Sequence, residues 1–530
     1  MDEKNLGGEI MLLSPLILED SARQKISVME FFSDKEAGTY SINYLCSELN
    51  LSYTTLSTLT QEIHNNLLDL AKKPFLTTNG KIAWEPKDYH HNEYIQYLVR
   101  TSIPYNFILY SLTKPEVTFE EFCDDFYLSQ STILRKLRPL KKYLDSFKIR
   151  LLASKMKITG NEAMIRMFYT TYLWAGNLGR DIHLSQFDFK EEREIMRTLH
   201  FDQADFMHPR EIFLRLAVNR LRAEQNYPLE LPQFKTLPFS EFLPALTTYC
   251  EKFIPDATQA YIQGRFISYM LYFTPFYINV DDFRIKELNN YYEELKERGS
   301  SLIDLIEEYE LFFFSELVPK THPDYEESFL LHINLFVTLT NYVIHQGDSP
   351  LIMDITRHEH EHEHEAYQEL LKRNNEFFRR ICRRKNFSWL TPCCDDLVED
   401  ITYNILPTFK NCYDHQMLNV GILNIPDYFI MQTVKEVLKQ FGFVQLFFTN
   451  FDDGNIDFFI STFKELLPDN LEKPAFIVEL VENSNYEKEL FAALWQAYRQ
   501  KVIRTSRNHD SILAQTNLLE VENEKSLSED

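Results

Sequence analysis

Hydrophobic side chains recur at helical spacing within residues 118–144 and predict a helix-turn-helix. The first helix has an apolar face at i, i+3 and i+7, formed by Phe119, Phe122 and Phe126. Tyr127 and Leu128 are expected to form the turn. Ser129 is a good N-cap for the next helix, because its hydroxyl can accept a hydrogen bond from a backbone N–H of the first turn.

The second helix is predicted to start after Ser129 and to kink or end near Pro139, since proline cannot donate a helical hydrogen bond. We expect three of its side chains to point inward: Ile133, Leu134 and Leu137. Two β-like runs follow, Lys148–Leu152 and Lys155–Thr159, and predict an antiparallel hairpin. Together these elements predict a winged helix-turn-helix, a fold that places one helix in the major groove of DNA.

An internal repeat supports this interpretation, because residues 22–70 match the same stretch at a constant offset of 77. Leu45-Cys46 aligns with Phe122-Cys123, and Thr54-Thr55-Leu56 aligns with Ser131-Thr132-Ile133. The alternative is a chance likeness of two amphipathic hairpins. The helices predicted for this first unit are Ala22–Phe32, Ile42–Leu49 and Tyr53–Leu70.

The rest of the chain changes pattern twice. A hairpin with a turn at Asn79-Gly80 and a single helix Asn92–Leu112 are expected between the two units. Residues 161–407 read as helical and contain a weak repeat at an offset of 122, in which Asn219 matches Asn341. Residues 415–503 predict a small parallel α/β domain. Its expected strands are Val420–Leu423, Val444–Phe448, Phe458–Ser461 and Ala475–Leu480, and its expected helices are Asp427–Phe441 and Asn485–Arg499.

The predicted fold is therefore mainly α and multi-domain. It begins with two helix-turn-helix domains, residues 1–90 and the winged domain 91–162. Two helical-bundle domains are predicted at residues 163–284 and 285–404, and the α/β domain at 405–503. Residues 504–530 are polar and acidic and are expected to be disordered.

Charge is distributed unevenly, and it points to DNA. The whole chain carries a net charge of −24, yet residues 131–160 hold nine Lys or Arg and one acid, Asp145. A basic helix and a basic hairpin in an acidic protein are typical of a DNA contact, although a solvated helix face is the simpler alternative. The candidate DNA-binding residues of the winged domain are Ser131, Thr132, Arg135, Lys136, Arg138, Lys141, Lys142, Lys155 and Lys157.

The matching outward residues of the first unit are polar but uncharged: Thr54, Thr55, Thr58 and Gln61. They read bases, touch phosphates weakly or only brace the second unit. Seven Cys without a CxxC pair fit reduced thiols, and no apolar run reaches the ~20 residues that span a bilayer. We therefore expect a cytoplasmic protein without a membrane segment.

The order of these parts resembles the Mga/AtxA family of global virulence regulators of Gram-positive bacteria. The similarity is strongest in Leu128–Lys136, in Ile158–Glu162 and in Ile165-Arg166, which is similar to the junction between the wing and the next domain. The resemblance covers nearly the whole chain. It implies an activator with broad targets, which favours DNA shape over sequence and binds promoter DNA.

The same resemblance implies that the helical domains are phosphotransferase-system regulation domains. It also implies that the last domain resembles enzyme IIB and helps to form a homodimer. HPr or enzyme II components would be partners, and the candidate phosphorylation sites are His200, His208 and His332. The offset of 122 places Arg210 opposite His332, so an ordinary surface or core role for these histidines stays open. The IIB-like loop at residues 424–427 has no Cys, which indicates a structural domain without phosphotransfer.

A run of alternating His and Glu contains the pattern H-E-x-x-H twice, and its histidines are His358, His360, His362 and His364. A metal-dependent hydrolase is one interpretation, but a low-complexity run that binds metal adventitiously is the better one. We see no phosphate loop, Ser-His-Asp spacing or dinucleotide fingerprint, and therefore expect no enzyme activity and no cofactor. A phosphotransferase-linked RNA-binding antiterminator is the other alternative. Such a protein would open with a small all-β domain.

Overall fold

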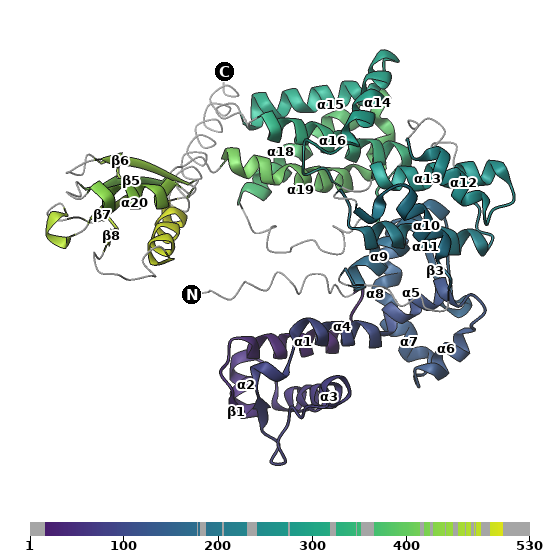
Figure 1. The fold of residues 1–530 in the computed structure, drawn as a ribbon, viewed down its shortest axis with the longest axis horizontal. Helices are drawn as coiled ribbons and strands as arrows, with labels where there is room; N and C mark the ends of the chain where they lie inside the picture. The colour runs from purple at the N-terminus through teal and green to yellow at the C-terminus, as the bar shows by residue number, and fades with distance from the viewer. Residues whose placement is uncertain are drawn as a thin grey trace, which may run out of the picture. The chain divides into compact units, whose positions relative to one another are not determined.

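The computed structural model describes residues 16–501, apart from a set of gaps (Figure 1). The gaps are residues 178, 181–186, 204–205, 231–240, 274–275, 319–324, 346, 351–364, 414–417, 424–427, 440, 442, 449–453, 462, 468–470, 472 and 479–487. The chain forms two compact units, of which unit 1 is residues 1–313 and 324–406, and unit 2 is residues 314–323 and 407–530. Within the described residues, none of the helices is both long enough and apolar enough to cross a membrane.

Unit 1 begins with a winged helix-turn-helix. Its elements are α1 (Asp20–Ser33), β1 (Gly38–Tyr40), α2 (Ile42–Leu49), α3 (Tyr53–Ala71) and β2 (Ile82–Trp84). The predicted hairpin is present, since Leu76 bridges Ile82 and the turn lies at Gly80. Strand β1 pairs antiparallel with β2 and was not predicted, because three residues without alternating polarity give no strand signal.

The second unit follows after a short turn, η2 (Pro86–Asp88). Its elements are α4 (His91–Thr101), α5 (Ile103–Thr113), α6 (Phe119–Asp125), α7 (Gln130–Lys136), α8 (Arg138–Ser146), β3 (Arg150–Leu152), η3 (Ala153–Lys155) and β4 (Lys157–Thr159). The single helix expected over residues 92–112 is wrong. Ser102 has extended backbone angles and caps α5, because Pro104 cannot continue α4. The break expected near Pro139 is confirmed, since α7 ends at Lys136 and α8 starts at Arg138.

The repeat at an offset of 77 is confirmed by backbone geometry. Asn50 and Tyr127 occupy equivalent turn positions, and both have left-handed angles, with φ of 52° and 53°. Ser52 and Ser129 are equivalent N-caps, and each hydroxyl accepts a hydrogen bond from the residue three positions on. The matched inward positions are fully or almost fully buried in both units: Leu56 and Ile133, Ile63 and Leu140, Leu67 and Leu144.

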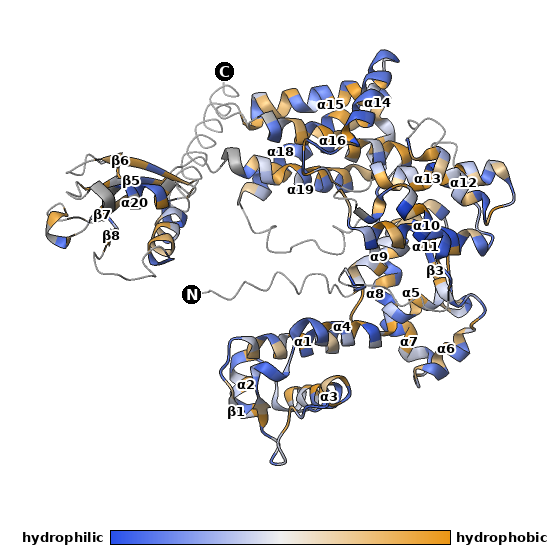
Figure 2. Ribbon diagram, in the orientation of Figure 1, coloured by the Kyte–Doolittle hydropathy of each residue, from blue (hydrophilic) through white to orange (hydrophobic). Residues whose placement is uncertain are grey.

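Residues 162–413 form a helical region, as predicted. Its helices are α9 (Glu162–Asn177), α10 (Lys190–Thr198), α11 (Pro209–Glu224), α12 (Leu243–Glu251), α13 (Ala257–Tyr272), α14 (Ile285–Glu297), α15 (Ser301–Phe312), α16 (Tyr325–His345), α18 (Glu365–Cys382) and α19 (Cys394–Tyr413), with short turns η4 (Phe201–Gln203), η6 (Phe313–Leu317) and η8 (Lys385–Cys393). Most of these helices carry both polar and apolar turns, as helices that bury one face do (Figure 2). The matched asparagines Asn219 and Asn341 are both buried.

A buried ion network joins the wing to this helical region. Gly160 follows β4 with a φ of 139°, and a Cβ there would lie 2.9 Å from Ile149 Cγ2. Asn161 Oδ1 then accepts hydrogen bonds from the first N–H groups of α9. The next residue, Glu162, accepts from Arg166 Nε at 2.8 Å and from Arg222 of α11 at 2.7 and 2.9 Å. The two arginines are almost fully buried.

Unit 2 contains a four-stranded parallel sheet in the order β6-β5-β7-β8, as the sequence predicted. The strands are β5 (Leu418–Ile422), β6 (Val444–Phe448), β7 (Phe458–Ser461) and β8 (Ala475–Ile477). Helix α20 (Tyr428–Lys439) and a last helix at residues 488–501 share one core with Leu418, Val420 and Ile422. Both helices therefore cover the same face of the sheet. The loop at residues 424–427, which was expected to lack a nucleophilic Cys, lies outside the described residues.

The buried network predicts a large stability difference between two Glu→Gln substitutions. Glu162→Gln leaves two buried guanidinium groups without their carboxylate, and we expect it to destabilise the fold by about 3–5 kcal/mol. Glu224→Gln removes an exposed partner of Arg220 and should cost less than about 1 kcal/mol. The measurement is denaturant unfolding of the full chain, with hydrogen exchange of residues 150–177 as a local readout. Equal effects of the two substitutions would show that the network is not important for stability.

Candidate nucleic-acid interface

The helix-turn-helix is held by a capping box and by a tight turn. Thr118 caps α6, and its backbone N–H and its hydroxyl both donate to the Glu121 carboxylate, at 2.8 and 2.9 Å. These two hydrogen bonds lower the pKa of Glu121. Cys123 lies buried where α6 meets its neighbours, and burial raises the pKa of its thiol, as in an inert structural cysteine.

The start of α7 is fixed by Ser129, whose hydroxyl lies 3.0 Å from Ser131 Oγ and 2.9 Å from Thr132 Oγ1. Ser131 is exposed, whereas Thr132 is half-buried and tied to this cap. Thr132 therefore positions the helix, while Ser131 lies on the surface that can face DNA.

The exposed face of α7 differs from the prediction at one position. Ile133 and Leu137 are buried, as expected, but Leu134 is 48% exposed, so its predicted inward orientation is wrong. The buried positions along α7 and α8 are separated by three or four residues, and Leu134 lies about 100° around the helix from Ile133. Leu134 consequently lies beside Arg135 on the solvent side.

The wing presents its charges by alternation. Leu151 of β3 pairs with Ile158 of β4, and both side chains are buried. Arg150 and Lys157 flank this pair and are exposed, because successive side chains of a strand point to opposite faces. Lys155 is exposed in the turn that joins the two strands.

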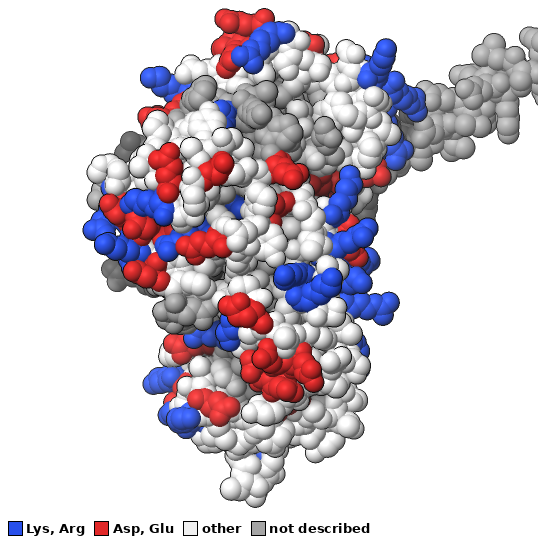
Figure 3. All heavy atoms as spheres, turned by 90° about the vertical axis from the view of Figure 1, so that its right-hand side faces the viewer, with Lys and Arg blue, Asp and Glu red and all other residues white. Residues whose placement is uncertain are grey.

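The interface contains a set of exposed cations without an internal counter-ion. Eight side chains of this region have no ion pair within 4.0 Å to another described residue: Arg135, Arg138, Lys141, Lys142, Lys148, Arg150, Lys155 and Lys157. Lys136 is different, since it is half-buried and lies 3.2 Å from Glu19. Figure 3 shows a band of Lys and Arg along one edge of the face, at the height of α8 and β3 in Figure 1, above a group of Asp and Glu. We call the eight side chains the basic surface.

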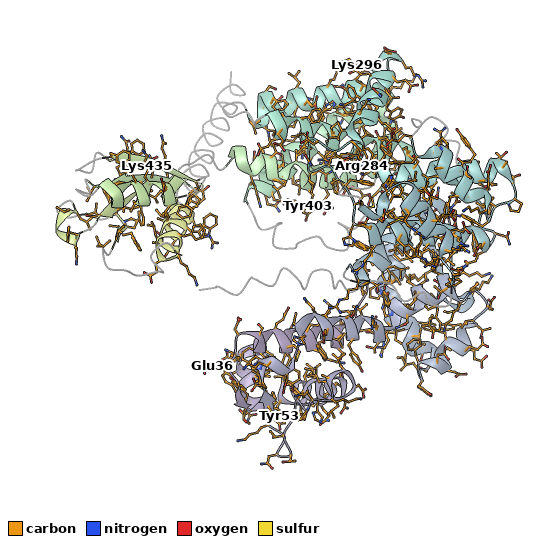
Figure 4. The ribbon with its side chains drawn as sticks, viewed as in Figure 1. Glu36, Tyr53, Arg284, Lys296, Tyr403 and Lys435 are labelled. Atoms are coloured by element: carbon orange, nitrogen blue, oxygen red, sulfur yellow. The ribbon has the colours of Figure 1, made fainter. Side chains whose placement is uncertain are left out.

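The equivalent surface of the first unit is polar. Thr54, Thr58 and Gln61 of α3 are exposed, and Thr55 is half-buried, with its hydroxyl 2.8 Å from the Ser52 cap. Tyr53, labelled in Figure 4, is 57% exposed at the start of α3. The predicted residues of this unit therefore lie on one helix, but they carry no charge.

The three candidate histidines lie in different surroundings. His200 is exposed in a turn with φ of 56°. His208 is exposed and caps α11, where its Nδ1 accepts from the Arg210 N–H at 3.2 Å. His332 is half-buried against Tyr292, and its Nδ1 lies 2.7 Å from Glu310 Oε1. His358, His360, His362 and His364 lie outside the described residues.

Two exposed apolar residues of the interface were missed from the sequence, Leu134 and Tyr127. Tyr127 is 94% exposed at the turn between α6 and α7. The repeat contained a signal for both positions. At the offset of 77 they match Ser57 and Asn50, which are polar, whereas Ile133 matches the buried Leu56.

The comparisons with known proteins agree with this geometry. The family model described as the Mga helix-turn-helix domain matches residues 87–173, from η2 through most of α9. The match thus includes α6, α7, α8 and the wing, which carry the basic surface. No curated protein matches the chain. Residues 87–173 are an Mga helix-turn-helix domain, and through this domain the chain is identified as a DNA-binding transcription regulator in agreement with the Mga/AtxA family.

Proposed function

We propose that this protein acts in the cytoplasm as an activator with broad targets, and that it binds promoter DNA through α7, α8 and the wing of its Mga domain. The observation that carries the proposal is the basic surface. An unpaired cation keeps its full charge for a phosphate, and each phosphate contact releases a counter-ion from DNA. Eight such side chains on one helix-turn-helix and its wing are typical of a duplex contact.

The residues of α7 have different roles in this proposal. Arg135 and Arg138 lie three residues apart on the exposed face and contact phosphates or guanine edges. Leu134 lies on the same face, and an apolar side chain in the major groove can contact a thymine methyl group. Most of the surface is charge, however, so DNA shape and backbone position contribute more to selectivity than base contacts do.

The second copy of the chain is the proposed protein partner, and unit 2 offers the surface for it. Phe491 and Trp495 of the last helix are 42% and 43% exposed, and their rings stack at 6.3 Å. Phe443 packs against Trp495 at 5.3 Å, and the neighbouring β6 is an edge strand whose Phe448 is 58% exposed. An aromatic surface beside an open strand edge is suited to self-association.

Phosphotransferase-system control through HPr or an enzyme II component is a further part of the proposal. His208 has the surroundings that best suit a phosphate among the three candidate histidines. It lies at the N-terminus of α11, where the helix dipole and the nearby Arg210 favour added negative charge. His332 contacts the Glu310 carboxylate, which would repel a phosphoryl group.

The antiterminator alternative does not fit the described residues. Residues 16–160 fold as helices with short hairpins rather than as a small all-β RNA-binding domain. The hydrolase alternative depends on residues 358–364, which the structure does not describe.

The basic surface predicts the salt dependence of DNA binding. We expect full-length protein to bind a promoter fragment with a steep negative slope of log affinity against log salt. Arg135→Ala and Lys142→Ala should each weaken binding to all duplexes and reduce that slope by about one. Lys136→Ala is the matched control, because this side chain is already paired with Glu19 and should change the slope less. Parent-like slopes for Arg135→Ala and Lys142→Ala would exclude the basic surface as the contact.

The aromatic surface predicts the oligomeric state. Trp495→Glu places a charge in the proposed dimer contact and should weaken self-association by about thirtyfold or more in analytical ultracentrifugation. Gln496→Glu adds the same charge at the next exposed position of this helix and should leave the dimer intact. A parent protein that stays monomeric at all concentrations, or equal effects of the two substitutions, would contradict the proposed contact.

A further inference from the structure

A cavity lies in the second half of the helical region, apart from the basic surface and from the candidate histidines. Its volume is about 340 Å³, and residues of α14, α15, α16 and η8 line it. Its apolar walls include Leu302, Leu305, Ile344, Phe387 and Trp389. Small-molecule sites commonly measure roughly 300–1,000 Å³ and are mostly apolar with a few polar groups, so this cavity has a suitable size and wall.

One end of the cavity is positive. Arg298 lines it and its side chain is 60% exposed, so the guanidinium lies at the open side. Ser300 and Ser301 line the cavity as well, and they form the N-terminus of α15. A helix of this length directs unpaired backbone N–H groups and a partial positive charge toward an anion at its N-terminus.

The exposed acids near this end do not cancel it. Glu294 pairs with Arg298 one helical turn away, and Asp304 lies in the first turn of α15. Glu294 is itself 46% exposed, and exposed ion pairs of this kind contribute about 0–1 kcal/mol. A ligand anion that also receives the N–H groups of α15 can therefore compete for Arg298.

The other end contains a buried polar group without a partner. Thr340 of α16 lines the cavity and is 2% exposed, and its Oγ1 has no hydrogen-bond partner among the described residues. Leaving a buried hydroxyl unsatisfied costs about 1–3 kcal/mol. A threonine in a helix usually bonds to a carbonyl of the preceding turn, so a hydroxyl left open toward a cavity indicates a group that arrives with a ligand.

We propose that this cavity is a binding site for a small amphipathic acid. The carboxylate or phosphate of the ligand binds Arg298 and the N-terminus of α15, and its apolar body lies against Leu305 and Phe387. A hydroxyl or carbonyl at its far end bonds to Thr340. The site is independent of the proposed DNA contact, and neither one needs the other.

The test is calorimetric titration of the full-length protein with three probes of equal chain length: octanoate, 8-hydroxyoctanoate and 1-octanol. We expect saturable one-to-one binding of octanoate, with 1-octanol weaker because it lacks the anion. The terminal hydroxyl of 8-hydroxyoctanoate should tighten binding by about twofold to tenfold, the contribution of one hydrogen bond. Thr340→Val keeps the side-chain shape, and it should abolish this gain without changing the affinity for octanoate.

The charge at the mouth has its own matched pair of variants. Arg298→Gln should weaken octanoate by about tenfold. Lys296→Gln removes a charge two residues away, at the end of α14 (Figure 4), and should leave octanoate binding unchanged, because Lys296 pairs with Glu307 and does not line the cavity. The proposal is overturned if neither carboxylate binds saturably, if 1-octanol binds as tightly as octanoate, or if the two variants behave alike. DNA binding measured on the same samples keeps this result separate from that of the basic surface.

Discussion

The contact between Glu162 and two buried arginines is the constraint on which the DNA-facing part of the molecule depends. One carboxylate serves two guanidinium groups, so the buried network carries an excess positive charge. Burial lowers the pKa of Arg166, and the Glu162 carboxylate opposes that shift. The remaining N–H groups of Arg166 donate to Asn219 at 3.0 Å, to Gln263 at 2.6 Å and to the Tyr227 carbonyl at 2.8 Å. Without these acceptors the desolvation of two arginines would exceed what a single carboxylate returns.

This network decides where the wing lies. Glu162 follows the last wing strand by three residues, and those residues are fixed by the left-handed region at Gly160 and by the Asn161 cap. Glu162 is bonded to α11 through Arg222, and Arg166 is bonded to α13 through Gln263. The wing is thus attached to three helices of the next domain through polar bonds that have specific directions. A rearrangement of α11 against α13 would have to break those bonds or move the wing, so the network is a physical route by which the helical region and the basic surface can influence one another.

Local signals explain what could be predicted from the sequence. The N-caps, the turn positions and the breaks at Pro104 and Pro139 depend on residues within a few positions of one another, and of these only the Pro104 break was missed. The parallel sheet of unit 2 was also predictable, because each strand is a short apolar run. The ion network was not, since Arg166 meets partners that lie 53 and 97 residues away and is an ordinary helix arginine in the sequence. The exposure of Leu134 and the unpaired Thr340 hydroxyl likewise depend on packing that only the fold reveals.

The two helix-turn-helix units show which positions specify the fold and which specify the surface. At the offset of 77 the inward positions stay apolar and buried, and the caps stay Ser or Thr. The outward positions differ in charge: Thr58, Gln61 and Asn65 of the first unit match Arg135, Arg138 and Lys142 of the second. Position 136 marks the boundary between the two classes. Its counterpart Leu59 is buried, and Lys136 is held half-buried by Glu19 rather than released to the surface. One backbone geometry therefore carries a neutral face and a basic face, and only the basic face has the charge that a phosphate backbone requires.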